Sequence, residues 1–215
     1  MSLRRLALTA LCICDPLEKV QAVQLLWATQ KDAMLSPNEQ LHQEAHQTLP
    51  GRPALPRLIP AKHVPTRTPF TPEGFAALLH AVCHIEFNAI NLALDAVWRF
   101  PHMPEPYYTD WLRVAYEESQ HFEMLHTHLQ SLGHRYGDFD AHDGMWHMCQ
   151  KTANDVLARM ALVPRTLEAR GLDPVAFYSE LAKRYEAPKL RPPFNKEARK
   201  RAGFTEAELD YLLGG

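Results

Sequence analysis

Apolar side chains recur at every third or fourth position in three long stretches of the chain, and this spacing is typical of helices that bury one face. The stretches cover residues 72–99, 107–132 and 145–170. Each would be a helix roughly 40 Å long at 1.5 Å per residue. Because the connections between them are short, we predict an all-α protein, built as an antiparallel helical bundle.

Residues that begin or end helices flank these stretches. Thr71 can cap the first stretch, with Pro72 at the first helical position. Gly133 follows the second stretch and Gly171 the third, where left-handed backbone commonly ends a helix. Pro164 predicts a kink inside the third stretch.

The part of the chain before residue 72 is less regular. Residues 1–14 indicate the entry into a helix that Asp15 caps and that extends over about 15–30. Residues 36–48 are polar and are predicted to form a second, short helix. Prolines recur from residue 50 to residue 72, so this segment is predicted to be an extended strap on the surface.

These patterns divide the chain into four segments. They are an N-terminal helical segment over 1–49, a proline-rich strap over 50–71, a helical core over 72–187 and a C-terminal tail over 188–215. Shorter helices are predicted over 174–186, inside the core, and near 205–213, in the tail.

Composition narrows the setting in which such a bundle works. The chain has 215 residues, 46% of them apolar, which is enough for a sizeable core. A net charge of −2 without a long run of one sign argues against nucleic acid or a membrane as the partner. The four cysteines form no Cys-x-x-Cys pair, which favours thiols in a reducing cytoplasm, and Cys12 with Cys14 is only a weak sign of metal or redox chemistry.

The first long stretch carries one carboxylate on its apolar side. Glu86 lies four residues after Val82 and four before Ile90, so the three share one helix face. An ionised carboxylate on a buried face is costly unless a positive group meets it. That group is either a lysine or arginine side chain, or a metal ion.

The second stretch carries a carboxylate and an imidazole on its apolar side. Glu118 and His121 lie three residues apart in line with Val114 and Leu125, whereas Glu117 points to solvent. A Glu-x-x-His pair lets one carboxylate and one imidazole reach the same ion, and it is the repeated unit of di-iron carboxylate bundles.

The Glu-x-x-His motif alone is weak, because a chain with twelve histidines produces it by chance. It recurs twice more in polar surroundings, as Glu39 with His42 and as Glu123 with His126. What favours metal binding is the apolar face that Glu118 and His121 share, together with Glu86 on the neighbouring stretch.

The third stretch adds Glu168, near its inner face, as a fourth candidate ligand. The alternative for Glu168 is an ion pair with Arg165 or Arg170. His80 and His84 flank Glu86 and are interpreted as groups behind the ligands or on the surface.

Several segments together resemble a bacterial family known as domain of unknown function 455, which belongs to the ferritin-like superfamily. They are residues 80–90 (HAVCHIEFNAI), 113–122 (RVAYEESQHF), 142–146 (HDGMW), 158–173 (ARMALVPRTLEARGLD) and 191–195 (RPPFN). The resemblance implies a ferritin-like bundle with a di-iron-type site held by Glu86, Glu118, His121 and Glu168. It implies no known reaction.

The chain departs from this family after residue 173. Family members continue there into a fourth long helix with an Asp-Glu-x-x-His motif, and about fifty residues of this kind are missing. In the short helix predicted over 174–186, Glu180 is followed three positions later by Lys183. The chain therefore lacks the Glu/His pair of a second metal site.

Two classes of function follow from these residues. The enzyme class is an O2-dependent di-iron oxidase or hydroxylase, with iron or else manganese as the metal and a small-molecule substrate that the sequence does not identify. The binding class is a non-catalytic metal-binding protein, or a structural bundle whose carboxylates meet arginines. The missing second Glu-x-x-His favours the binding class.

The missing helix also bears on the oligomeric state. Three long helices leave one side of a four-helix core uncovered, and the helix predicted over 174–186 is half the length needed to cover it. We therefore expect either a homodimer that covers the gap with a second copy, or a poorly stable monomer.

Overall fold

The structure, a computed structural model, describes residues 1–44, 47–163, 184–186 and 206. The chain divides into two compact units, Met1–Asp143 and Gly144–Gly215. The described residues are mostly helical and contain isolated bridges but no β-strand, which confirms the all-α prediction for this part of the chain. The single core predicted over 72–187 stays a prediction.

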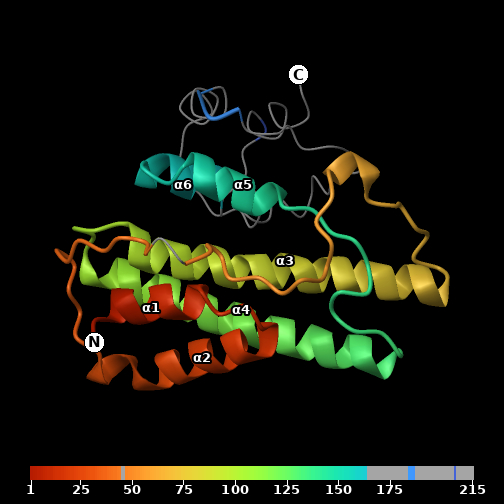
Figure 1. Cartoon of the computed structure of the whole chain (residues 1–215), viewed down its shortest axis with the longest axis horizontal. Helices are drawn as coiled ribbons and strands as arrows, with labels where there is room; N and C mark the ends of the chain where they lie inside the picture. Colours follow the sequence, from red (N-terminus) through yellow and green to blue (C-terminus); the bar gives the residue numbers. More distant parts are fainter. Residues whose placement is uncertain (45–46, 164–183, 187–205, 207–215) are drawn as a thin grey trace. The chain divides into compact units, whose positions relative to one another are not determined.

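The described residues of the first unit form four α-helices (Figure 1). They are α1 (Leu3–Leu11), α2 (Pro16–Thr29), α3 (Pro72–Arg99) and α4 (Glu105–Ser131), with 3-10 turns at Gln30–Asp32 and Ala61–His63. The long helices α3 and α4 run antiparallel and share the largest helix–helix interface. The shorter helices α1 and α2 pack against α3 and α4 respectively.

The predicted helix boundaries of the first unit are confirmed by local capping. The Asp15 carboxylate accepts the backbone N–H groups of Leu17 and Glu18, each at 2.9 Å, at the start of α2. The Thr71 hydroxyl accepts the N–H of Gly74 at 3.1 Å at the start of α3. Gly133, just after α4, has a φ of +79°, the left-handed conformation that favours glycine.

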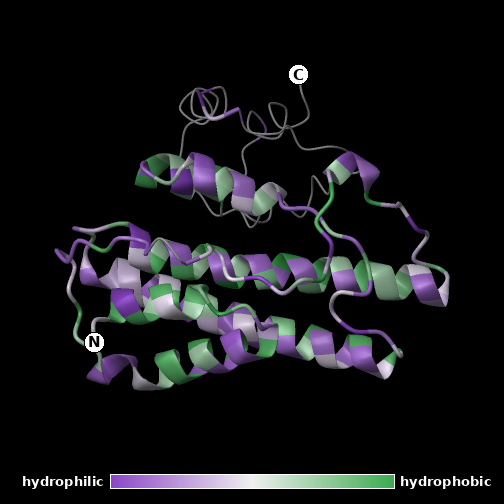
Figure 2. Ribbon diagram, in the orientation of Figure 1, coloured by the Kyte–Doolittle hydropathy of each residue, from purple (hydrophilic) through white to green (hydrophobic). Residues whose placement is uncertain are grey.

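One face of the α3–α4 pair is covered by the N-terminal helices. Trp27 of α2 stacks on Tyr116 of α4 with ring centroids 5.4 Å apart, and the Gln24 amide of α2 donates to the Glu123 carboxylate of α4 at 3.0 Å. Hydrophobic and hydrophilic residues are interleaved along all four helices, as expected for helices that bury one side (Figure 2). The helix predicted over 15–30 is therefore part of the bundle.

The short helix predicted over 36–48 is wrong, because the described residues of this segment are not helical. The buried guanidinium of Arg4 donates instead to the backbone carbonyls of Ser36, Pro37 and Glu39. Its Nη2 atom donates to the carbonyl of Trp98 at 2.6 Å, near the end of α3. In a helix these three carbonyls would accept hydrogen bonds from backbone N–H groups four residues later. Here they accept hydrogen bonds from the Arg4 side chain.

The proline-rich strap is extended as predicted, apart from the turn at Ala61–His63, but parts of it are buried. The N–H of Gly51 donates to the Leu11 carbonyl at 2.8 Å, and a Cβ on Gly51 would lie 2.2 Å from the Cys12 carbonyl oxygen. Further along, Ile59 and Ala141 are joined by a backbone hydrogen bond of 2.9 Å. The strap is therefore an integral layer of the first unit.

In the second unit, the helix predicted over 145–170 is broken. Its described residues, 145–163, form α5 (Gly144–Lys151) and α6 (Val156–Leu162). The Thr152 hydroxyl donates to the Met148 carbonyl at 2.9 Å, and Asp155 caps α6 by accepting the N–H of Ala158 at 2.9 Å. The kink at Pro164, the helix near 205–213 and most of the helix over 174–186 lie outside the described residues.

By length and composition alone, α3 is apolar enough to cross a membrane. However, 56% of its apolar window is buried inside the structure. Because α3 packs against both α1 and α4, it is the core helix of this unit.

Candidate metal centre

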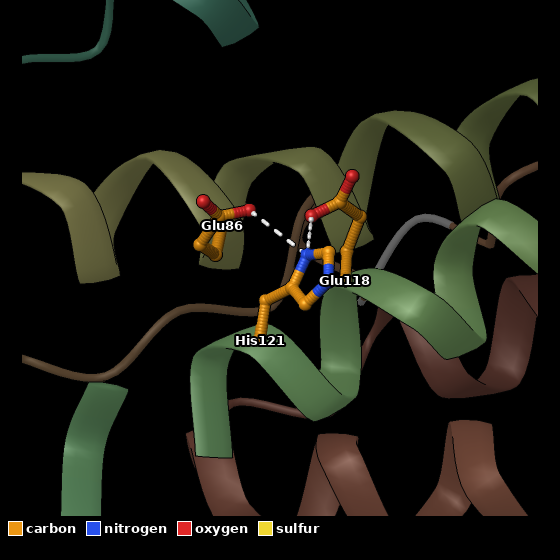
Figure 3. A group of neighbouring side chains, drawn as sticks. All are labelled: Glu86, Glu118 and His121. Atoms are coloured by element: carbon orange, nitrogen blue, oxygen red, sulfur yellow. Dashed lines mark hydrogen bonds and ion pairs between the residues drawn. The ribbon is translucent and has the colours of Figure 1, made fainter. Parts of the chain in front are cut away.

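The middle of the α3–α4 pair brings three of the predicted ligands together (Figure 3). Glu86 comes from α3, and Glu118 and His121 come from α4, one helical turn apart. The Nδ1 atom of His121 lies 3.1 Å from a carboxylate oxygen of Glu118 and 3.9 Å from one of Glu86. One ligand atom from each residue can be chosen so that all three lie within 4.8 Å of one another.

The three side chains differ in how far they are buried. The exposed fraction is 8% for the Glu118 side chain, 19% for Glu86 and 53% for His121. The prediction that Glu118 is the interior carboxylate is confirmed, because its neighbour Glu117 is exposed. His121 is on the predicted side of α4, but its imidazole forms the outer rim of the cluster instead of being buried.

The described residues offer Glu86 no basic side chain other than His121. Its one ion pair within the described part of the chain is the contact with the His121 imidazole. The alternative raised by the sequence, a lysine or arginine partner for Glu86, is therefore not found among the described residues.

The donor set and its spacing fit one transition-metal ion. Oxygen and nitrogen ligands bind such ions at about 2.0–2.2 Å, so neighbouring ligand atoms on one ion lie about 3 Å apart. The Glu118 to His121 distance already has this value, whereas the nearest Glu86 oxygen lies 3.9 Å from the same His121 nitrogen. Carboxylate with imidazole is a donor set that suits iron and manganese.

A thiol lies near the cluster but does not belong to it. Cys83, one turn before Glu86 on α3, is fully buried, and its Sγ contacts the Phe122 carbonyl at 3.9 Å. Burial, with a smaller contribution from the Glu86 charge, raises the pKa of Cys83 to about 12. The thiol therefore stays protonated at neutral pH and offers no thiolate ligand.

Apolar side chains flank the cluster on the same side of α3. Leu78 and Ile85 are 49% and 47% exposed, and Val82 between them is half-buried. On α4, Val114 and Leu125 are half-buried on either side of Glu118. The cluster thus lies within an apolar strip that is only partly covered.

The histidines that flank Glu86 face the other way and are buried, so their interpretation as surface groups is wrong. His84 shares a hydrogen bond of 2.7 Å between its Nδ1 and the Tyr136 hydroxyl, and its Nε2 donates to the His142 carbonyl at 3.1 Å. His80 Nε2 accepts the N–H of Gly137 at 2.9 Å. Burial lowers the pKa of both imidazoles to about 4, so both are neutral.

A cavity of about 20 Å³ lies beside this second polar group, between the strap and α3, and it could hold one water molecule. Its lining includes Arg52, His84, Asn88 and Tyr136. The Arg52 guanidinium is neutralised by Asp143 at 2.5 Å. Each of these groups has a partner in the fold, so the cavity is a structural feature of the first unit.

Sequence reasoning missed a buried lysine. The Lys19 ammonium of α2 donates to the carbonyl of Gly51 and to the Asn91 side chain, and it lies 4.9 Å from the centroid of the Phe87 ring. Burial lowers the pKa of Lys19 to about 7. In the sequence, Lys19 is visible only as a charged residue within the apolar pattern of α2. That pattern does not distinguish a buried lysine from one on the surface.

Two other predicted sites have different outcomes. Glu168, the fourth predicted ligand, lies outside the described residues. Cys12 and Cys14 are free thiols, the first half-buried and the second exposed. Within the described part of the chain, they do not join a group of three potential metal ligands.

Comparison with known proteins gives a family but no function. A family profile described as "Protein of unknown function (DUF455)" matches residues 12–176, more than half of the chain. A protein of Haemophilus influenzae, described as "Uncharacterized protein", is 56% identical over 128 residues, which cover 56% of this chain and 44% of that protein. No solved structure matches the chain.

Proposed function

The chain belongs to the DUF455 family, for which no function is described, and from the geometry of its own residues we propose that it binds iron. The observation that carries the proposal is the convergence of Glu86, Glu118 and His121 from two helices on one point. Manganese is the second ion that this donor set fits. The free thiols of the chain fit a reducing compartment, the cytoplasm.

The arrangement of α3 and α4 supports the further proposal that they are half of a ferritin-like bundle. Two antiparallel helices of 28 and 27 residues are joined by a short connection and carry their ligands at mid-length. In four-helix carboxylate proteins, the ligands project inward from facing helices at this height. Glu168, if it faces the same point, would be a fourth ligand from the same chain.

The three side chains would contact the ion from different sides. Glu118, the most buried of the three, would anchor the ion, and Glu86 would bind it from the facing helix. The Nδ1 atom of His121 lies next to the two carboxylates and the His121 side chain is 53% exposed, so ions and small molecules would reach the site on this side. The same half-exposed side favours a second candidate function, an O2-dependent oxidase or hydroxylase. The chemistry that Fe(II) supplies when bound with open coordination positions is the activation of O2.

A non-catalytic metal-binding protein remains the alternative, because the described residues supply one Glu-x-x-His and not two. Oxygen uptake separates these alternatives. After anaerobic loading with Fe(II), an oxidase consumes O2 in repeated turnovers when a reductant is supplied. A binding protein consumes O2 at most once per iron, as the Fe(II) is oxidised.

The test of metal binding compares two adjacent glutamates on α4. Purified protein reconstituted with Fe(II) is expected to hold about one ion per chain by elemental analysis, and Glu118→Ala is expected to lose most of it. Glu117→Ala, the matched control, should keep the ion, because the Glu117 side chain points to solvent. Metal content under about 0.1 ion per chain in the unmodified protein would refute the proposal. Equal loss in the two variants would show that α4 does not hold the ion through this face.

A further inference from the structure

We propose that Cys12 and Cys14 form a reversible disulfide, with a small disulfide such as glutathione disulfide as the oxidant, and that its formation loosens the strap at Gly51. This inference goes beyond the proposed metal binding and does not depend on it. It assigns a role to the Cys-x-Cys pair, which is not part of the metal cluster.

The two thiols lie in the turn that joins α1 to α2. Cys12 ends α1, and Cys14 precedes Asp15, the residue that caps α2. The Cys14 Sγ atom lies 3.9 Å from the Cys12 carbonyl oxygen, so the Cys14 side chain is turned back toward residue 12. Residues two positions apart have Cα atoms within about 7 Å of each other, and disulfides span about 4.4–6.8 Å between Cα atoms. The covalent chain therefore keeps the pair close to the separation that a disulfide requires.

The two thiols differ in their access to solvent and in their electrostatic surroundings. Cys14 is exposed, whereas Cys12 is half-buried. Burial raises the pKa of Cys12, the charge of Lys19 acts in the opposite direction, and a charge on Cys14 acts in the same direction as burial. Cys14 is therefore the thiol that meets a disulfide from solution. Cys12 ionises more readily once Cys14 has lost its negative charge.

The reaction is a thiol–disulfide exchange in two steps. The Cys14 thiol releases its proton to water, and the thiolate attacks one sulfur of the small disulfide, which expels a thiolate and leaves a mixed disulfide on Cys14. The Cys12 thiolate then attacks the Cys14 sulfur and expels the second small thiolate. The two protein thiols thus lose two electrons and two protons, and the small disulfide becomes two thiols.

The strap packs tightly over the same turn. The N–H of Gly51 donates to the Leu11 carbonyl at 2.8 Å, and the Gly51 carbonyl accepts from the Lys19 ammonium at 2.8 Å. A Cβ on Gly51 would overlap the carbonyl oxygens of Cys12 and Ile13, so the backbone of the turn fills the space beside Gly51. A disulfide between residues so close in sequence constrains the backbone between them. A change in this backbone is transmitted to Gly51, because the contact leaves no free space.

The other two cysteines do not compete for this chemistry. Cys83 and Cys149 are both buried, so Cys12 is the remaining thiol that can resolve a mixed disulfide on Cys14. The proposed cytoplasmic setting fits the same reading, because disulfides in a reducing cytoplasm are usually transient and serve catalysis or redox sensing.

The experiment exposes the full chain to glutathione buffers, with a chelator present so that no metal catalyses thiol oxidation. After alkylation of the free thiols, the tryptic peptide 6–19, which contains both Cys12 and Cys14, is analysed by mass spectrometry. In excess oxidised glutathione this peptide is expected to lose two hydrogens, and excess reduced glutathione should restore both thiols. Cys83 and Cys149 should stay reduced throughout.

Two matched serine variants test the order of the steps. Cys12→Ser is expected to stop at a mixed disulfide of Cys14 with glutathione, because the second thiol is missing. Cys14→Ser should take up glutathione about tenfold more slowly, because Cys12 is half-buried. Equal rates in the two variants would overturn the roles assigned to the two thiols.

Hydrogen exchange of the strap measures the coupling. In the oxidised full chain, the Gly51 amide is expected to exchange about tenfold faster than in the reduced chain. The Ile59 amide, which donates to the Ala141 carbonyl at 2.9 Å further along the strap, is the internal control and should not change. Cys12→Ser treated in the same way should keep the slow exchange at Gly51, because a mixed disulfide closes no ring.

Two further results would count against the inference. A chain that accumulates only mixed disulfides, or only disulfides between two chains, has no switch at Cys12 and Cys14. An intramolecular disulfide that leaves exchange at Gly51 unchanged would overturn the coupling to the strap. Since all these measurements are made on metal-free protein, their outcome is independent of whether the proposed metal binding holds.

Discussion

Lys19 shows how a charge can be built into the interior of this protein. Its ammonium group is fully buried and is held by two oxygens, from Gly51 of the strap and from Asn91 of α3. Burial lowers the pKa of Lys19 from 10.5 to about 7. Between pH 7 and pH 10.5, Lys19 is therefore protonated in the unfolded chain but mostly neutral in the native chain. The free energy of unfolding must then rise with pH across this window.

Replacing Lys19 with methionine should remove this pH dependence. The free energy of unfolding of the unmodified protein, measured by urea titration, is expected to gain on the order of 3 kcal/mol relative to Lys19→Met between pH 7 and pH 10. Lys31→Met, at an exposed position, is the control and should follow the unmodified protein. A constant difference between the unmodified protein and Lys19→Met at every pH would show that Lys19 titrates normally.

The clustering of the three candidate ligands, unlike the burial of Lys19, could be predicted at the residue scale. Glu118 and His121 are linked by helical spacing, and Glu86 by its place in an apolar pattern, so local sequence suffices to propose the cluster. The exposure of His121 could not be predicted, because it depends on which elements cover the α3–α4 pair. Lys19 and Arg4 were missed because each donates to a backbone carbonyl more than thirty positions away.

At the scale of elements, helix starts and stops were predictable where capping is local, as at Asp15 and Thr71. The segment 36–48 was mispredicted because Arg4, from another helix, binds its carbonyls. The break after α5 was missed because the apolar period continues across it. There the buried Arg159 donates to the Thr152 hydroxyl at 2.8 Å, which fixes the turn from the far side.

Arg4 is expected to hold three elements together. Arg4→Met would leave the Trp98 carbonyl at the end of α3, and the carbonyls of the segment after α2, without their buried donor. We expect a loss on the order of 3 kcal/mol in the free energy of unfolding by urea titration. Arg5→Met is the control, since the exposed ion pair of Arg5 with Glu39 is worth less than about 1 kcal/mol. Similar losses for both variants would mean that the buried carbonyls find other donors.

At the scale of the whole molecule, the division after Asp143 assigns all three clustered side chains to one unit. Glu86, Glu118 and His121, the candidate ligands, lie in Met1–Asp143, together with α1 to α4 and the strap. The first unit therefore contains a covered helix pair, its own core and the cluster. The predicted fourth ligand, Glu168, belongs to the other unit.

A fragment ending at Asp143 should fold and still bind metal. It is expected to give a single cooperative thermal transition and to bind Mn(II) through the same three residues, as measured by isothermal titration calorimetry. Glu168→Ala in the full chain measures what the second unit adds, and weaker binding in that variant would identify Glu168 as a ligand. Loss of the cooperative transition in the fragment would show that the first unit depends on the second for its stability.

The three candidate ligands lie close together along the chain, which bears on how they could be inherited. From Glu86 to His121 the gene encodes one helical hairpin, and this hairpin alone carries a carboxylate from one helix and a Glu-x-x-His from the next. A hairpin of this kind is inherited as a unit. A duplication of this hairpin inside one gene would double the number of candidate ligands without any other change to the chain.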